Sequence, residues 1–181
     1  KDGDPFFGVL SVQPPHDPYV APPEHEKNYT PESIQMRPNV PDIPRVKDPA
    51  REDLAGYYAQ IENLDANLGR ILDTLEAEGM AENTHVIFFS DHGDSHGSHG
   101  HFRKSNPYEE AVRIPCIVLP AGGRRVQEQS NAPFNHVDFA PTSLGLCGID
   151  VPNWMEGTDF SHHVITGRPA PQEEPTSAYI Q

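Results

Sequence analysis

An apolar strand that ends in an acid, a histidine and a glycine is the feature that most constrains the fold of this 181-residue chain. Residues 85–90 have the character of a buried strand, and Asp91, His92 and Gly93 follow directly. Because glycine lets the backbone turn tightly, we expect the two preceding side chains to remain at the strand tip. A carboxylate and an imidazole there predict half of the coordination shell of a divalent cation. The alternative is that Asp91 caps a turn and that His92 is packed in the interior.

Two more side chains are candidates for the same chemistry. Lys104 follows the turn, where its ammonium could offset the charge that develops on an anionic ester. His16 lies in a proline-framed loop and could donate to an ester oxygen or act as a general acid. Each also has a simpler interpretation, as a solvated lysine and as a structural or exposed histidine.

Three more histidines follow His92 within ten residues, at positions 96, 99 and 101. A separate zinc site is one interpretation of this tract. The intervening glycines favour a flexible or tightly curved loop instead, in which one or two of the histidines face the active site and the others are solvated. His99 is the candidate substrate-binding residue of this tract.

The remaining pattern predicts an α/β fold. Short apolar strands are expected at residues 5–12, 85–90 and 114–119. A long helix is expected from a cap at Asp48 to Gly79, with shorter helices at 106–112 and 139–147. This alternation predicts a mostly parallel sheet with helices on both faces, in which ligands bind at the carboxyl ends of the strands. His16 follows the first strand and Asp91 the second, so we expect one shared site.

The charge and the apolar runs exclude several kinds of partner. A net charge of −14 argues against nucleic acid and against anionic membrane surfaces. No apolar run reaches the eighteen or so residues that a membrane span requires. The chain shows neither a starting methionine nor a targeting segment, so we expect it to begin within a longer protein, and its compartment stays open.

Several short motifs, in this order, resemble the sulfatase family, which has the alkaline-phosphatase-like fold. The resemblance extends from about residue 6 to residue 161. The motifs that carry it are Pro14-Pro15-His16-Asp17-Pro18-Tyr19, Ser90-Asp91-His92-Gly93-Asp94, Gly97-Ser98-His99-Gly100 leading to Lys104, Pro107-Tyr108-Glu109-Glu110-Ala111 with Arg113-Ile114-Pro115, Val137-Asp138-Phe139-Ala140-Pro141-Thr142, and Gly157-Thr158-Asp159.

The resemblance implies roles for four residues. Asp91 and His92 would be metal ligands, Lys104 would bind the sulfate group, and His16 would contact the sulfate or the leaving oxygen. Calcium is the metal that the family implies. Many sulfatases carry asparagine where His92 stands, so manganese, magnesium and zinc are open as well. The implied partner is a sulfated small molecule or glycan.

The chain also departs from the family. The family's nucleophile is a formylglycine made from cysteine or serine in a Cys/Ser-x-Pro-x-Arg motif, and neither Cys116 nor Cys147 lies in such a motif. We therefore expect residues 1–165 to be the later part of a sulfatase catalytic domain, inactive alone. Residues 166–181 would be a linker and the start of a small C-terminal subdomain. Exposed sheet edges predict self-association. The alternative functions are phosphodiester or phosphonate-ester hydrolysis on the same scaffold, and a non-catalytic metal- or glycan-binding piece.

Overall fold

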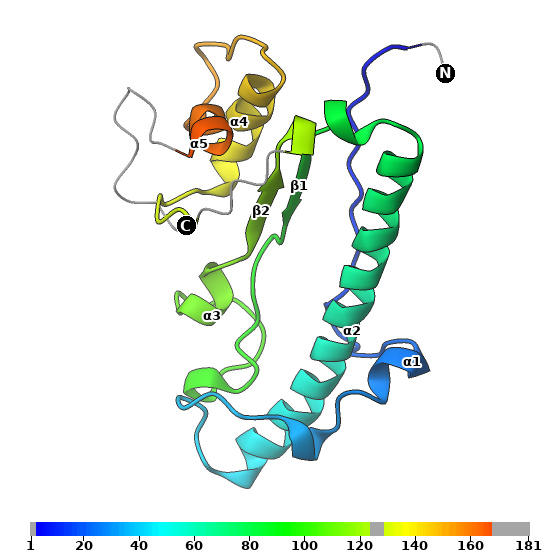
Figure 1. Ribbon diagram of the computed structural model, residues 1–181. Helices are drawn as coiled ribbons and strands as arrows, with labels where there is room; N and C mark the ends of the chain where they lie inside the picture. Colours follow the sequence, from blue (N-terminus) through cyan, green and yellow to red (C-terminus); the bar gives the residue numbers. More distant parts are fainter. Residues whose placement is uncertain (1–2, 124–128, 168–181) are drawn as a thin grey trace. The chain divides into compact units, whose positions relative to one another are not determined.

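The computed structural model describes residues 3–123 and 129–167 (Figure 1). The chain divides into two compact units, and each is described by itself. The first contains Lys1–Arg70 and His96–Phe102, and the second contains Ile71–Ser95 and Arg103–Gln181. The described residues form α1 (Pro23–Glu26), α2 (Pro44–Ala77), β1 (Val86–Phe89), α3 (Glu109–Val112), β2 (Cys116–Leu119), α4 (Phe139–Leu146) and α5 (Ser161–Thr166). Short 3-10 turns occupy Pro31–Ser33, Ala81–Asn83, Ser98–Gly100, Ala121–Gly123 and His136–Asp138.

The predicted long helix is present as α2, although it begins earlier than expected. The carbonyl of Ile43 accepts the first bonds of the helix, from the N–H groups of Val46 and Lys47. Pro44 supplies the φ angle that suits a first helical position, so the helix starts there and not at Asp48. Pro49 consequently lies inside α2. The predicted end is confirmed, because Gly79 has a left-handed φ of +66° just beyond Ala77.

The expected first strand, at residues 5–12, is absent. These residues have no regular structure, and Phe7 and Leu10 are 81% and 72% exposed. Their apolar pattern is that of a strand, but a strand needs a partner for its backbone N–H and C=O groups. Within residues 3–123 and 129–167, no segment supplies that ladder to residues 5–12.

The second unit contains both strands of the described sheet. The strands β1 and β2 were predicted from sequence, but they pair antiparallel, with Val86 opposite Leu119 and Phe89 opposite Cys116. A parallel pair needs a crossover that returns the chain to the edge where the first strand began. The connection over residues 90–115 contains only short helical pieces, α3 and the 3-10 turn Ser98–Gly100, and β2 begins beside the end of β1, with Cys116 opposite Phe89. The residues of both strands are half-buried or exposed, whereas the sequence predicts fully buried strands.

The predicted helix at 139–147 corresponds to α4, which packs beside α5 (Figure 1). Asp138 does not cap it with its side chain. This buried carboxylate instead accepts the backbone N–H groups of Asn135 and Thr158, each at 2.7 Å. Asp138 thereby fastens the start of α4 to the segment that leads into α5. The predicted C-terminal subdomain, 166–181, lies outside the described residues except for Thr166 and Gly167.

No helix within the described part of the chain has the length and apolar character needed to cross a membrane.

Candidate metal- and anion-binding site

Asp91 and His92 lie just beyond the end of β1, as predicted, with their side chains facing one another. Nε2 of His92 lies 3.4 Å from Oδ2 of Asp91. Nδ1 of the same ring is 2.8 Å from the carbonyl oxygen of Gly93, which can only accept, so Nδ1 is the protonated nitrogen of the neutral ring. The lone pair of Nε2 is then directed toward the carboxylate side. This arrangement is the one that a histidine uses when it binds a metal, with its second nitrogen held by a carbonyl.

The carboxylate of Asp91 is kept ionised by its surroundings. Its Oδ1 accepts the backbone N–H of His92 at 2.9 Å, and the hydroxyl of Ser90 lies 3.4 Å away. Partial desolvation opposes ionisation, but the charge that His92 carries whenever its ring is protonated and these hydrogen bonds together outweigh the desolvation, so the pKa of Asp91 is lowered. Its side chain is 84% exposed. A cation arriving at neutral pH would therefore meet a charged and accessible oxygen.

The tight turn after His92 depends on Gly93. Its N–H donates to the carbonyl of Ala111 at 2.8 Å. A Cβ at position 93 would lie 2.0 Å from the carbonyl oxygen of Glu110. The backbone of α3 therefore supports the site directly. In the same segment, Arg113 and Glu109 form an exposed ion pair at 3.6 Å.

Lys104 belongs to the same unit as Asp91 and lies in a strained turn. Arg103 and Ser105, on either side of it, have φ angles of +68° and +74°. Residues other than glycine rarely adopt this conformation, at a cost of roughly 1–3 kcal/mol each. Asp94 accepts the N–H of Arg103 at 2.9 Å and holds the turn closed. Backbone strain of this kind is typical of residues that a functional site holds in a fixed position.

One residue near this site was missed from the sequence. His136 has its Nε2 atom 3.1 Å from the carbonyl oxygen of Ser90, and its ring packs near Phe89 and Phe139. It therefore braces the tip of β1 from the segment before α4. Its place directly before the motif Val137-Asp138-Phe139-Ala140-Pro141-Thr142 was the signal that the sequence offered.

His16 belongs to the first unit, in the proline-framed loop where it was expected. Its Nδ1 lies 2.9 Å from both the carbonyl oxygen and a carboxylate oxygen of Asp17. Its side chain is 41% exposed. The peptide bonds Pro14-Pro15 and Asp17-Pro18 are both cis.

The loop that carries His16 is fastened to α2 by a residue that sequence analysis overlooked. Gln60 is buried, and its amide nitrogen lies 3.0 Å from the carbonyl oxygen of Pro18 and 3.1 Å from that of Val20. One helical turn earlier, a Cβ on Gly56 would lie 2.1 Å from the carbonyl oxygen of Tyr19. The sequence did offer a signal: a glutamine and a glycine stand four residues apart on the apolar face of the predicted helix. This pattern is typical of a helix face against which another backbone segment packs.

The histidine tract is divided between the two units. His92 belongs to the second unit, whereas His96, His99 and His101 belong to the first. His96 is fully buried, and its ring packs against those of Tyr19 and Tyr57, at centroid distances of 5.2 and 4.5 Å. No group of three or more His, Cys, Asp or Glu side chains that could hold a metal occurs in the described ranges. The structure therefore gives no support to a separate zinc site.

His99 is exposed and is held by Asn39. Its Nε2 lies 3.0 Å from the amide nitrogen of Asn39, which donates, and its backbone N–H donates to the Asn39 carbonyl at 2.9 Å. The five predicted residues thus fall into two groups: Asp91, His92 and Lys104 in the second unit, and His16 and His99 in the first. A single shared site, and the metal and substrate roles of all five, stay predictions.

Comparisons with known proteins place this geometry in context. The family model described as "Sulfatase" matches residues 1–149. An "Ulvan-active sulfatase" of Formosa agariphila is 36% identical over 178 residues, which cover 96% of this chain and 34% of that protein. A Bacteroides thetaiotaomicron structure described with the metabolism of multiple glycosaminoglycans superposes with a TM-score of 0.85 at 29% identity, covering 97% of this chain and 37% of that one.

A third comparison concerns the fold alone. The phosphonate monoester hydrolase of Agrobacterium radiobacter superposes with a TM-score of 0.81 at 21% identity, over 94% of this chain and 40% of that one. These likenesses confirm the predicted alkaline-phosphatase-like α/β fold, of which the described residues form a part. The chain spans about a third of the length of the curated relative reported above.

Proposed function

This chain belongs to the sulfatase family, and we propose that the full-length gene product hydrolyses sulfate esters, with residues of this chain binding the metal and the sulfate group. One observation carries the proposal: the His92 and Asp91 side chains face one another beyond the end of β1, with Nδ1 of His92 held by the Gly93 carbonyl. A neutral imidazole nitrogen and an ionised carboxylate oxygen are the two donors that the family's metal site needs from this segment.

The donor set fits a divalent cation as half of a shell. Asp91 and His92 would hold the ion, with calcium favoured by the family and manganese, magnesium or zinc compatible with the imidazole. When bound, such an ion polarises the ester and stabilises negative charge. The exposed carboxylate of Asp91 leaves room for ligands from elsewhere in the full-length protein.

The other predicted residues would act on the substrate itself. Lys104, held in its strained turn, would offset charge on the sulfate oxygens. His16 would donate a proton or a hydrogen bond to the leaving oxygen, and Asp17 would orient its ring through Nδ1. His99 would contact the substrate from the loop that Asn39 anchors.

The substrate class we propose is a sulfated glycan. The Formosa agariphila relative, 36% identical, is an ulvan-active sulfatase by its name, and a solved structure at 29% identity is described in complex with its substrate, D-glucosamine-2-N,6-O-disulfate. Small sulfate esters would then be cleaved as minimal substrates.

Turnover by the full-length gene product tests the proposal. We expect hydrolysis of p-nitrophenyl sulfate that exceeds hydrolysis of phenylphosphonate and phosphodiester analogues. The reverse order would favour a phosphonate- or phosphodiester-hydrolase function on the same scaffold. An absence of turnover on every ester, with metal bound, would favour a non-catalytic binding role.

A further inference from the structure

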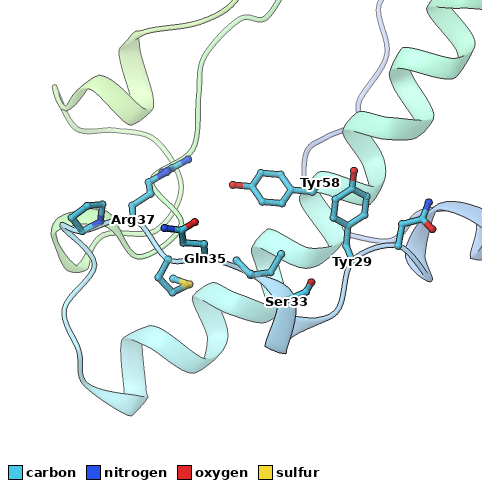
Figure 2. A pocket seen from close by; sticks show the side chains of 9 residues that line it. Tyr29, Ser33, Gln35, Arg37 and Tyr58 are labelled. Atoms are coloured by element: carbon cyan, nitrogen blue, oxygen red, sulfur yellow. The ribbon is translucent and has the colours of Figure 1, made fainter.

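The first unit contains an open pocket of about 560 Å³ that none of the roles proposed above uses. Eight of its lining residues come from the irregular segment before α2, and one comes from α2 itself. Figure 2 shows Tyr58 projecting from α2 toward the segment that carries Gln35 and Arg37, with Tyr29 beside it. The lining residues are Asn28, Tyr29, Ser33, Ile34, Gln35, Met36, Arg37, Pro38 and Tyr58.

One side of the pocket is aromatic and apolar. The rings of Tyr29 and Tyr58 lie 6.0 Å apart, centre to centre, and are tilted by 57°. Both pack against the small core that includes Ile34 and Leu54. Half-buried tyrosines offer a flat apolar face together with a polar edge. The C–H face of a sugar ring matches such a surface.

The walls of the pocket are held in place by hydrogen bonds behind them. Glu62 accepts from Asn28 at 2.8 Å, and His25 lies 3.1 Å from the same oxygen. The Tyr29 hydroxyl also bonds to Glu62; burial first, and then this carboxylate, raise the pKa of Tyr29. Arg51 reaches the carbonyl of Ile34 from α2. The pocket is therefore largely preformed, which lowers the entropy cost of binding a ligand.

The rim of the pocket is polar and carries a positive charge. Among its described lining residues, Arg37 is the only one that is charged at neutral pH. Its guanidinium donates to the hydroxyl of Ser98 at 3.2 Å, which fixes its direction. The exposed amide of Gln35 lies beside it (Figure 2). In a chain of net charge −14, an oriented arginine in the pocket lining makes this a local site for an anion.

We infer that this pocket binds a sugar ring that carries a sulfate or carboxylate group, within an oligosaccharide substrate. The tyrosine faces would contact the C–H face of the ring, Gln35 and Asn28 would bond its hydroxyls, and Arg37 would bind its anionic group. The inference rests on the proposed function, because it treats the ligand as part of the sulfated glycan to be cleaved. It adds that the protein recognises an oligosaccharide, and not only the sulfate ester.

A binding measurement on the 181-residue chain tests the pocket without relying on turnover. The probe is a purified oligosaccharide prepared from ulvan, intact or chemically desulfated, titrated by calorimetry. We expect Arg37→Met and Gln35→Ala each to weaken binding, the former by about tenfold, since it removes a charged hydrogen bond. Gln35 is exposed, so its replacement leaves the fold intact, and melting curves check Arg37→Met.

A control variant separates the pocket from its surroundings. Arg45→Met removes an exposed charge from α2 outside the pocket and should bind within about twofold of the unaltered chain. The inference would be overturned if the Arg37→Met and Gln35→Ala variants bound the oligosaccharide as tightly as the unaltered chain. It would also be overturned if Arg45→Met weakened binding as much as Arg37→Met does.

Kinetics on the full-length gene product distinguish this inference from the proposed function. Arg37→Met should raise KM for the sulfated oligosaccharide and leave kcat/KM for p-nitrophenyl sulfate unchanged. If p-nitrophenyl sulfate is cleaved but Arg37→Met leaves the oligosaccharide KM unchanged, the pocket inference is wrong and the proposed function stands. If the chain binds the oligosaccharide through Arg37 but no ester is cleaved, the proposed function is wrong and the pocket remains.

Discussion

Nε2 of His92 lies 3.4 Å from Oδ2 of Asp91, while Nδ1 of the same ring is bonded to the Gly93 carbonyl at 2.8 Å. The carbonyl fixes both the tautomer and the orientation of the ring, so that a nitrogen lone pair and a carboxylate oxygen converge beyond the end of β1. The lowered pKa of Asp91 keeps this oxygen ionised to lower pH than an ordinary aspartate.

The first prediction is that this pair binds a divalent cation in the chain as it stands. Added Mn²⁺ should broaden the backbone NMR signals of residues 91–93 first. Asp91→Asn and His92→Ala should each remove this selective broadening, because each deletes one of two donors. His162→Ala, an exposed histidine on α5, serves as the control and should change nothing. Broadening centred on His99 or His101 instead would contradict the assignment.

The second prediction compares two glycines of α2. A Cβ on Gly69 would meet no atom within 4 Å, so Gly69→Ala should stabilise the chain by about 1 kcal/mol through helix propensity. Gly56→Ala should destabilise it by about 1–3 kcal/mol, because the new methyl would meet the Tyr19 carbonyl. Denaturant unfolding measures both. A stabilising Gly56→Ala would mean that the loop bearing His16 does not rest on α2.

Much of this arrangement could be predicted from the sequence. The three- and four-residue spacing of apolar side chains predicts α2, and Gly79 predicts its end. The apolar runs at β1 and β2 predict strands, and Asp91-His92-Gly93 predicts a turn with both side chains at the tip of β1. These are local patterns, in which neighbouring residues determine the outcome.

The features that were missed depend on distant parts of the chain. The apolar run at residues 5–12 forms no strand, because pairing needs a partner that local sequence cannot supply. The antiparallel register of β1 and β2 depends on how residues 90–115 fold back. Gln60 and His96 are polar residues in buried positions, and their partners, the loop carbonyls and the rings of Tyr19 and Tyr57, are far away in sequence.

The third prediction concerns Gln60. Gln60→Leu keeps the volume of the side chain but leaves the carbonyls of Pro18 and Val20 without their donor, at a cost of about 1–3 kcal/mol. Amide exchange at His16 and Val20 should accelerate, since their backbone bonds belong to the same loop. Asn67→Leu, at an exposed position on α2, is the matched control. Unchanged exchange in Gln60→Leu would show that Gln60 does not anchor the loop.

The fourth prediction is a pH dependence at the wall of the pocket. The hydrogen bond from His25, followed by those from Tyr29 and Asn28, lowers the pKa of Glu62 below its usual 4.5. A carboxyl whose folded pKa is depressed stabilises the fold above its unfolded pKa, and this contribution is lost as pH falls through the lower folded pKa. Stability should therefore fall on acidification below about pH 4.5, and fall less steeply in Glu62→Gln. A Glu62 carboxyl signal that titrates above 4.5 in carbon NMR would contradict this.

The proposed function depends most on the carboxylate and imidazole beyond the end of β1, as the metal-binding half of a sulfatase site. The most direct test is the kcat/KM of the full-length gene product for p-nitrophenyl sulfate, measured with Asp91→Asn and with Asp73→Asn, an exposed aspartate on α2. We predict a loss of about 100-fold or more for Asp91→Asn, of the size seen when a charge-stabilising group is removed, and none for Asp73→Asn. Equal turnover by the Asp91→Asn variant and the unaltered protein would contradict the claim.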